Sequence, residues 1–82
     1  MIVFSAHAKE GNVRRKIPKN RIILTITNPD ETLDSFRGRK INRRKFNNKI
    51  LEVVTIVEAK TITIITQYYV GIENESKIRS SN

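Results

Sequence analysis

The stretch Lys49–Val70 reads KILEVVTIVEAKTITIITQYYV. β-Branched residues alternate along it, and Ala59-Lys60 interrupts it like a short turn, so we expect one long β-hairpin in which Glu58 pairs with Thr61. Because successive strand residues point to opposite faces, this register defines a core face and an outer face. The core face comprises Leu51, Val53, Thr55, Val57, Ile62, Ile64, Thr66 and Tyr68, and the outer face Ile50, Glu52, Val54, Ile56, Glu58, Thr61, Thr63, Ile65, Gln67 and Tyr69.

The chain before this hairpin begins with a short predicted strand, Ile2–Phe4. Ser5 follows it and is a residue that caps helix N-termini, so a helix is expected from Ala6 to about Lys16. Gly11-Asn12 lies in its middle and costs about 1 kcal/mol in helix propensity. The apolar residues near one face of this helix are Ala6, Val13 and Ile17.

A second helix is expected over Pro18–Thr27, because proline suits the first position of a helix. Ile22, Ile23 and Ile26 would form its buried stripe. The same residues are β-branched enough for a strand, but we favour the helix. Asn28-Pro29 ends the element, since the residue before proline is disfavoured in a helix.

Two shorter strands are predicted at Thr32–Phe36 and Lys40–Phe46, joined by a turn at Arg37-Gly38-Arg39. Ile41 and Phe46 are five positions apart and cannot both point inward on a regular strand, so we expect a bulge near Phe46-Asn47-Asn48.

The predicted fold is α+β, with two N-terminal helices packed on one face of a four-stranded antiparallel sheet in the order β-α-α-β-β-β-β. The first strand would pair at an edge of this sheet. The predicted domain spans residues 1–70, and residues 71–82 are expected to form a polar, flexible tail.

The chain has 82 residues, with 16 Lys and Arg against 8 Asp and Glu, a formal net charge of +8. This excess favours polyanions, so RNA is the expected partner and DNA the alternative. The sequence contains no cysteine, which excludes disulfides and thiol chemistry and suits a reducing compartment. No export signal or membrane-spanning run is apparent, and we expect a cytoplasmic protein.

Most of the positive charge lies between Arg14 and Lys49, opposed there by Asp30, Glu31 and Asp34. Such a patch could line a groove that follows a phosphate backbone, or it could be a solvated basic surface. Its members are Arg14, Arg15, Lys16, Lys19, Arg21, Arg37, Arg39, Lys40, Arg43, Arg44, Lys45 and Lys49.

His7 is the single histidine, and histidine is the side chain whose ordinary pKa suits proton transfer near neutrality. On a helix it would share one side with Arg14 or Arg15, so an imidazole and a guanidinium could face one phosphate. The alternative is a structural histidine at the helix N-terminus.

Tyr68 and Tyr69 point to opposite faces of the last strand, and Tyr69 is the candidate for stacking on a base, although strand aromatics are commonly packing residues. The three acids after Asn28 are interpreted as turn residues, and we expect neither a metal nor a cofactor.

Several short motifs together resemble a small prokaryotic family. They are Phe4-Ser5-Ala6-His7-Ala8, Arg14-Arg15-Lys16-Ile17-Pro18, Thr27-Asn28-Pro29-Asp30, Gly38-Arg39-Lys40, Leu51-Glu52-Val53-Val54 and Ile64-Ile65-Thr66. The chain resembles domain of unknown function forty-two fifty-eight, which is similar in layout to toxins of the RelE/ParE and BrnT types.

The resemblance implies a RelE-like fold and RNA cleavage without a metal. His7 matches the Ser-x-His-Ala element of the family, and Arg14 and Arg15 match its basic helix end. Gly11-Asn12 departs from the family, where a larger apolar or basic residue is usual.

Three functional hypotheses follow. In an endoribonuclease of the toxin type, His7 would be the general acid or base, and Arg14, Arg15 and Arg43 or Arg44 would stabilise the transition-state charge. In a non-catalytic module, the basic groove would bind nucleic acid or a protein. In the third, an acidic antitoxin-like partner covers the same groove. The nucleic-acid-binding residues would be Lys16, Lys19, Arg21, Arg39, Lys40, Lys45 and Tyr69.

Overall fold

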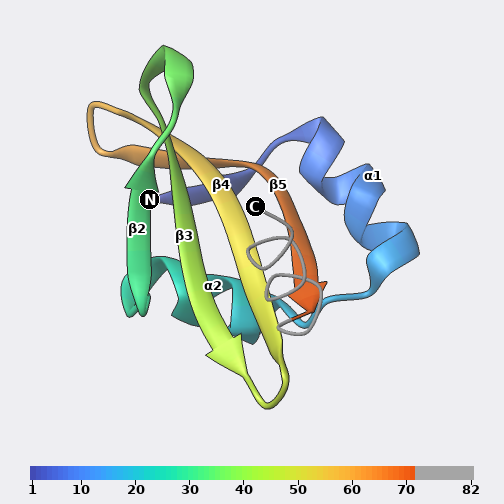
Figure 1. The fold of residues 1–82 in the computed structure, drawn as a ribbon. Helices are drawn as coiled ribbons and strands as arrows, with labels where there is room; N and C mark the ends of the chain where they lie inside the picture. The colour runs from blue at the N-terminus through green and yellow to red at the C-terminus, as the bar shows by residue number, and fades with distance from the viewer. Residues whose placement is uncertain (72–82) are drawn as a thin grey trace.

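The hairpin predicted at the centre of the chain is present in the computed structural model, which describes residues 1–71 (Figure 1). Strands β4 (Lys49–Glu58) and β5 (Thr61–Gly71) are antiparallel, and Glu58 lies opposite Thr61 as expected. Ala59 begins the two-residue turn with a positive φ of 55°. The β4–β5 hairpin is therefore determined by local sequence, namely the alternating β-branched residues and the two-residue turn.

A bulge at Ile65 changes which residues of β5 face the core. Thr55 pairs with Ile64 and Val54 with Thr66, so one extra residue of β5 lies between the two pairs. An extra residue inverts the alternation beyond it. Gln67 is consequently buried and Tyr69 packs against the core, so the predicted inward positions of Thr66 and Tyr68 are wrong.

The first half of the predicted core face is confirmed. Leu51, Val53 and Ile64 are fully buried, and Thr55 is nearly so. Val57, the next-to-last residue of β4, is 54% exposed.

Two further strands extend the sheet on the β4 side. They are β3 (Arg39–Phe46) and the short β2 (Glu31–Asp34), joined by a turn with a 3-10 segment, Phe36–Gly38. Phe46 pairs regularly with Lys49 across Asn47-Asn48, so the bulge predicted there is wrong. Phe46 faces the core and Ile41 the opposite side, as alternation requires for residues five apart.

The first strand, β1 (Ile2–Phe4), pairs with β5 in parallel and completes the sheet in the order β1-β5-β4-β3-β2. The α+β class is confirmed. The sheet has five strands and one parallel edge pair rather than four antiparallel strands. The expected position of the first strand at an edge of the sheet is confirmed.

Helix α1 (Ala6–Arg15) begins as predicted, with the Ser5 hydroxyl accepting a hydrogen bond from the Ala8 amide. Its buried residues are Ala8 and Gly11. The predicted face was wrong because Ala6 is exposed and Val13 is 73% exposed. Ile17 is buried, but it lies beyond the end of the helix.

The two residues that looked unsuited to α1 each have a specific contact at the end of this helix. A Cβ at Gly11 would overlap the guanidinium of Arg15, which lies back over this position. The Asn12 amide accepts from the Ile17 amide at 3.0 Å and donates to the Ile17 carbonyl at 2.9 Å. Together with the left-handed φ of 53° at Lys16, this clamp turns the chain toward the second helix.

Helix α2 (Lys19–Thr27) confirms the helical alternative for the isoleucine-rich stretch. Ile22 is fully buried, Ile26 packs against the core and Ile23 is half-buried. The buried hydroxyl of Thr25 donates a hydrogen bond to the Arg21 carbonyl, one turn earlier in the helix. Tertiary burial thus outweighs the β propensity of these residues.

Both helices cover the same face of the sheet, as expected. Ala8 of α1 and Ile22 of α2 share one core with strand residues of β4 and β5. Figure 1 shows α2 crossing behind the strands and α1 beside β5, so no helix of residues 1–71 lies on the face toward the viewer. Neither helix of residues 1–71 is long and apolar enough to span a bilayer. The tail predicted for residues 71–82 lies outside the described residues, except for Gly71, which ends β5.

Candidate nucleic-acid interface

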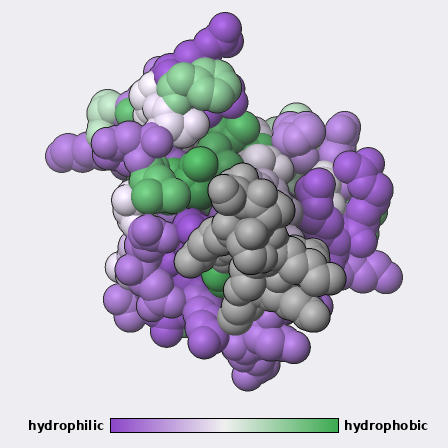
Figure 2. Space-filling view, in the orientation of Figure 1, coloured by the Kyte–Doolittle hydropathy of each residue, from purple (hydrophilic) through white to green (hydrophobic). Residues whose placement is uncertain are grey.

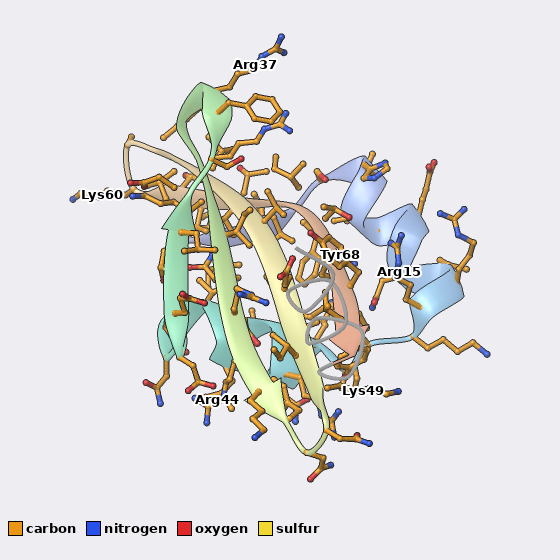
Figure 3. The ribbon with its side chains drawn as sticks, viewed as in Figure 1. Arg15, Arg37, Arg44, Lys49, Lys60 and Tyr68 are labelled. Atoms are coloured by element: carbon orange, nitrogen blue, oxygen red, sulfur yellow. The ribbon has the colours of Figure 1, made fainter. Side chains whose placement is uncertain are left out.

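Cations and aromatic rings gather on the helix-covered face at one end of the sheet. Arg44, Leu51 and Tyr69 are register partners across β3, β4 and β5, and the next row contains Phe46 and Lys49. Arg21 reaches the same place from the first turns of α2. We call the set Arg21, Arg44, Phe46, Lys49 and Tyr69 the basic–aromatic cluster. Figure 3 shows Arg44 and Lys49 at the foot of the sheet.

The cations of the basic–aromatic cluster lie over its rings. The guanidinium carbons of Arg21 and Arg44 are 5.1 Å and 5.7 Å from the centroid of the Phe46 ring. The Lys49 ammonium lies 5.3 Å from the centroid of Tyr69. Each contact of this kind contributes about 0.5–1 kcal/mol where it is partly solvated. The rings therefore hold the cations in place.

Arg21 also donates from Nη1 to the Tyr69 hydroxyl at 2.9 Å. This contact joins α2 to β5 across the edge of the core, with both side chains half-buried. Tyr69 can face Arg21 because the bulge at Ile65 turned it inward. Tyr69 is therefore not the freely exposed stacking residue that the regular alternation predicted.

Arg44 has a structural contact as well. Its Nη1 donates to the Asn28 carbonyl at 2.7 Å, at the C-terminal cap of α2. A cation at this end of a helix is favourable because the macrodipole is negative there. Arg44 consequently links β3 to α2, while Lys49 remains the exposed cation of the cluster.

The positive charge of the basic–aromatic cluster is not matched by carboxylates of residues 1–71. Within residues 1–71, none of its three cations forms an ion pair with a carboxylate. The first turn of α2 has no acidic residue and no side-chain cap, so its amide dipoles add to the positive potential around Arg21. Lys19 lies in this turn, with its ammonium 5.5 Å from the Phe4 ring. Repulsion among these cations would be relieved by an anion.

The residues predicted on the first helix form a separate group. His7, Arg14, Arg15 and Lys16 are all exposed, the first three on α1 and the last at its end. Within residues 1–71, the His7 side chain makes no hydrogen bond or ion pair. Figure 3 shows Arg15 on α1, on the opposite side of the view from Arg44. The proposed acid or base and the β3 arginines are therefore not brought together.

Two of the four other basic residues of β3, Lys40 and Arg43, form ion pairs with the acids after Asn28. Lys40 pairs with Asp34, and Arg43 Nη1 lies 3.1 Å from Glu31. Asp30 accepts a hydrogen bond from the Lys45 amide at 2.8 Å. These acids thus bind β3 rather than only forming a turn. The Lys45 side chain is exposed and Arg39 is half-buried near the far end of the strand.

Arg43 belongs to a row of polar residues across the helix-free face. Glu31, Arg43, Glu52 and Tyr68 are successive register partners on β2, β3, β4 and β5. Arg43 Nε lies 2.8 Å from the Glu52 carboxylate. Partial burial, with the hydrogen bond to Glu52 and its negative charge, raises the pKa of Tyr68 to about 12. We call these four residues the polar ladder.

The helix-free face differs in character from the basic–aromatic cluster. Figure 2 shows apolar surface in the upper centre of this view, with hydrophilic residues around it. Neighbouring positions on this face are Leu33, Ile41 and Val54, with Leu33 40% exposed. This face also carries Arg43 and the exposed Lys45, but Arg43 is paired with Glu31 and Glu52. The cations of the basic–aromatic cluster have no such ion pair within residues 1–71, so we take the helix-covered side as the candidate interface.

Phe46 had not been proposed as a site residue, and Lys49 had been placed only in the broad basic patch and not among the named binding residues. Their proximity could have been inferred from the two-residue turn at Asn47-Asn48, which places them opposite each other. The assumed bulge hid this signal. Residues 1–71 bring together no group of three His, Asp or Glu side chains that could hold a metal.

Comparisons with known proteins found no matching family model, no matching curated protein and no matching solved structure. The resemblance to domain of unknown function forty-two fifty-eight therefore stays a prediction.

Proposed function

We propose that the protein binds RNA, without cleaving it, through the basic–aromatic cluster and the basic residues beside it. The observation that carries this proposal is the gathering of Arg21, Arg44 and Lys49 on two rings with no ion pair to a carboxylate in residues 1–71. Phosphate oxygens are the natural partners of such cations, and a net charge of +8 supports a polyanionic ligand.

The interface extends from the cluster toward α1. The Asn12 side chain hydrogen-bonds to Ile17 in the connection between α1 and α2. Lys19 lies two residues after Ile17. The exposed residues Arg14, Arg15 and Lys16 come just before it. A phosphate backbone that follows these cations would contact α2 and the end of α1. An extended line of this kind fits a polyanion better than a small anion.

Cleavage is not part of this proposal. A metal-independent mechanism needs a proton-transfer group beside the cations that stabilise the transition state. His7 comes from α1, whereas the cluster is built from α2, β3, β4 and β5. The geometry therefore supports binding better than a reaction at His7.

The test compares two variants that remove equal positive charge. Lys19→Gln/Lys49→Gln changes the proposed interface, and Arg37→Gln/Lys60→Gln changes exposed cations at the other end of the sheet (Figure 3). Fluorescence anisotropy with a labelled single-stranded RNA, repeated over a range of salt, gives affinity and salt dependence. Each phosphate contact that is lost should reduce the slope of log affinity against log salt by about 0.7.

We expect weaker binding and a flatter slope for the Lys19/Lys49 variant, with the Arg37/Lys60 variant close to wild type. Equal effects of both pairs would mean that net charge alone attracts RNA and would refute the proposed interface. RNA that becomes shortened during the titration would contradict binding without cleavage. Tighter binding of polyglutamate than of RNA would instead favour an acidic protein partner.

A further inference from the structure

We propose that Arg21, Lys49 and the Tyr69 hydroxyl together bind one phosphate group of the RNA backbone, without selecting the base. This inference rests on the proposed function and assigns a chemical role to each of the three side chains. We call these three side chains the phosphate subsite.

The Tyr69 hydroxyl is available as a donor. Its oxygen accepts a hydrogen bond from Arg21 Nη1 at 2.9 Å, and within residues 1–71 its proton is donated to no group. A phenol whose oxygen accepts from a guanidinium becomes a better donor, because hydrogen bonds in a chain polarise one another. A phosphate oxygen, which is only an acceptor, suits this proton.

Lys49 adds a charge at the same ring. Its ammonium lies 5.3 Å from the centroid of Tyr69, and its backbone pairs with Gly71, two residues after Tyr69. Lys49 is exposed, so its flexible end can leave the ring for a ligand at small cost. Arg21, held between Tyr69 and Phe46, presents the remaining donors of its guanidinium.

The rings of the cluster are used by the protein itself. Phe46 has Arg21 and Arg44 over it, and Tyr69 has Lys49. A base would have to displace one of these cations in order to stack, which would cost the contact and move the charge that attracts the phosphate. Recognition at this subsite is therefore directed at the phosphodiester group, and RNA of any sequence is the expected ligand.

Tyr69→Phe tests the subsite with the smallest change. It keeps the ring under Lys49 and removes only the hydroxyl. The affinity for labelled oligouridylate and oligoadenylate should fall about tenfold, to the same extent for both, since a hydrogen bond to a charged acceptor is lost. The salt slope should stay unchanged because a neutral group has been removed.

Tyr68→Phe is the matched control. It removes the hydroxyl of the adjacent residue, which lies in the polar ladder on the helix-free face. It should bind both RNAs like wild type. Circular dichroism on each variant confirms folding. Lys49→Gln gives a second test at an exposed residue. In the Lys49→Gln/Tyr69→Phe double variant, the loss of binding free energy should be smaller than the sum of the two single losses, because both groups contact one phosphate.

The outcomes separate this inference from the proposed function. Wild-type affinity in Tyr69→Phe, with weak binding still seen in Lys19→Gln/Lys49→Gln, overturns the subsite and leaves the proposed function standing. Wild-type affinity in both overturns the proposed function as well. An equal loss in Tyr68→Phe moves the contact to the helix-free face, and a loss that differs between the two RNAs refutes recognition without base selection.

Discussion

The polar ladder makes the stability of the protein sensitive to alkaline pH through Tyr68. The pKa of this phenol is raised from 10.0 to about 12, first by burial and then by Glu52. Below pH 10 the phenol is protonated in both the folded and the unfolded state. Between pH 10 and pH 12 it ionises in the unfolded chain but stays neutral in the folded one, so stability falls as pH rises.

The size of this effect can be bounded. Two pKa units correspond to about 2.7 kcal/mol at 1.36 kcal/mol per unit. The ring is partly exposed and solvent screens its interaction with Glu52, so we expect a loss of about 1 kcal/mol.

Tyr68→Phe isolates this contribution because it removes only the Tyr68 hydroxyl and leaves every other ionisable group in place. Urea unfolding followed by circular dichroism should find wild type more stable than the variant below pH 10. The difference should shrink by about 1 kcal/mol as pH approaches 12. A difference that is constant or grows over this range would refute the ladder as the origin of the raised pKa.

Three backbone positions give further predictions. Ala59→Gly should raise the free energy of unfolding by about 0.5–1 kcal/mol, because Ala59 holds a φ of 55° that strains an L-residue, although glycine also gains entropy in the unfolded chain. Urea melts check this, and Asn47→Gly, where asparagine already tolerates a φ of 57°, should gain less. Gly11→Ala should stabilise α1 by less than the full helix-propensity gain of about 1 kcal/mol, because its Cβ displaces the Arg15 guanidinium. The same substitution in an Arg15→Ala background should recover that gain, and a net loss there would mean that the sheet, not Arg15, limits the space at Gly11.

The sequence by itself determined the elements whose causes are local. The β-branched alternation and the Ala59-Lys60 turn define the β4–β5 hairpin, and Ser5 marks the start of α1. The proline at position 18 likewise precedes α2. Each of these depends on backbone preferences and hydrogen bonds within a few residues, which a single sequence reveals.

The tertiary structure decided which side chains meet. One unpaired residue, Ile65, inverts the second half of β5, and only packing on the helices selects Gln67 and Tyr69 over Thr66 and Tyr68 for the covered face. The contact between Arg21 and Tyr69 depends on this shift and joins residues 48 positions apart. Arg21, Arg44 and Tyr69 could therefore be named from the sequence as candidate site residues. Their meeting around Phe46 could not be predicted, because strand register and helix docking are settled by the burial of the whole core.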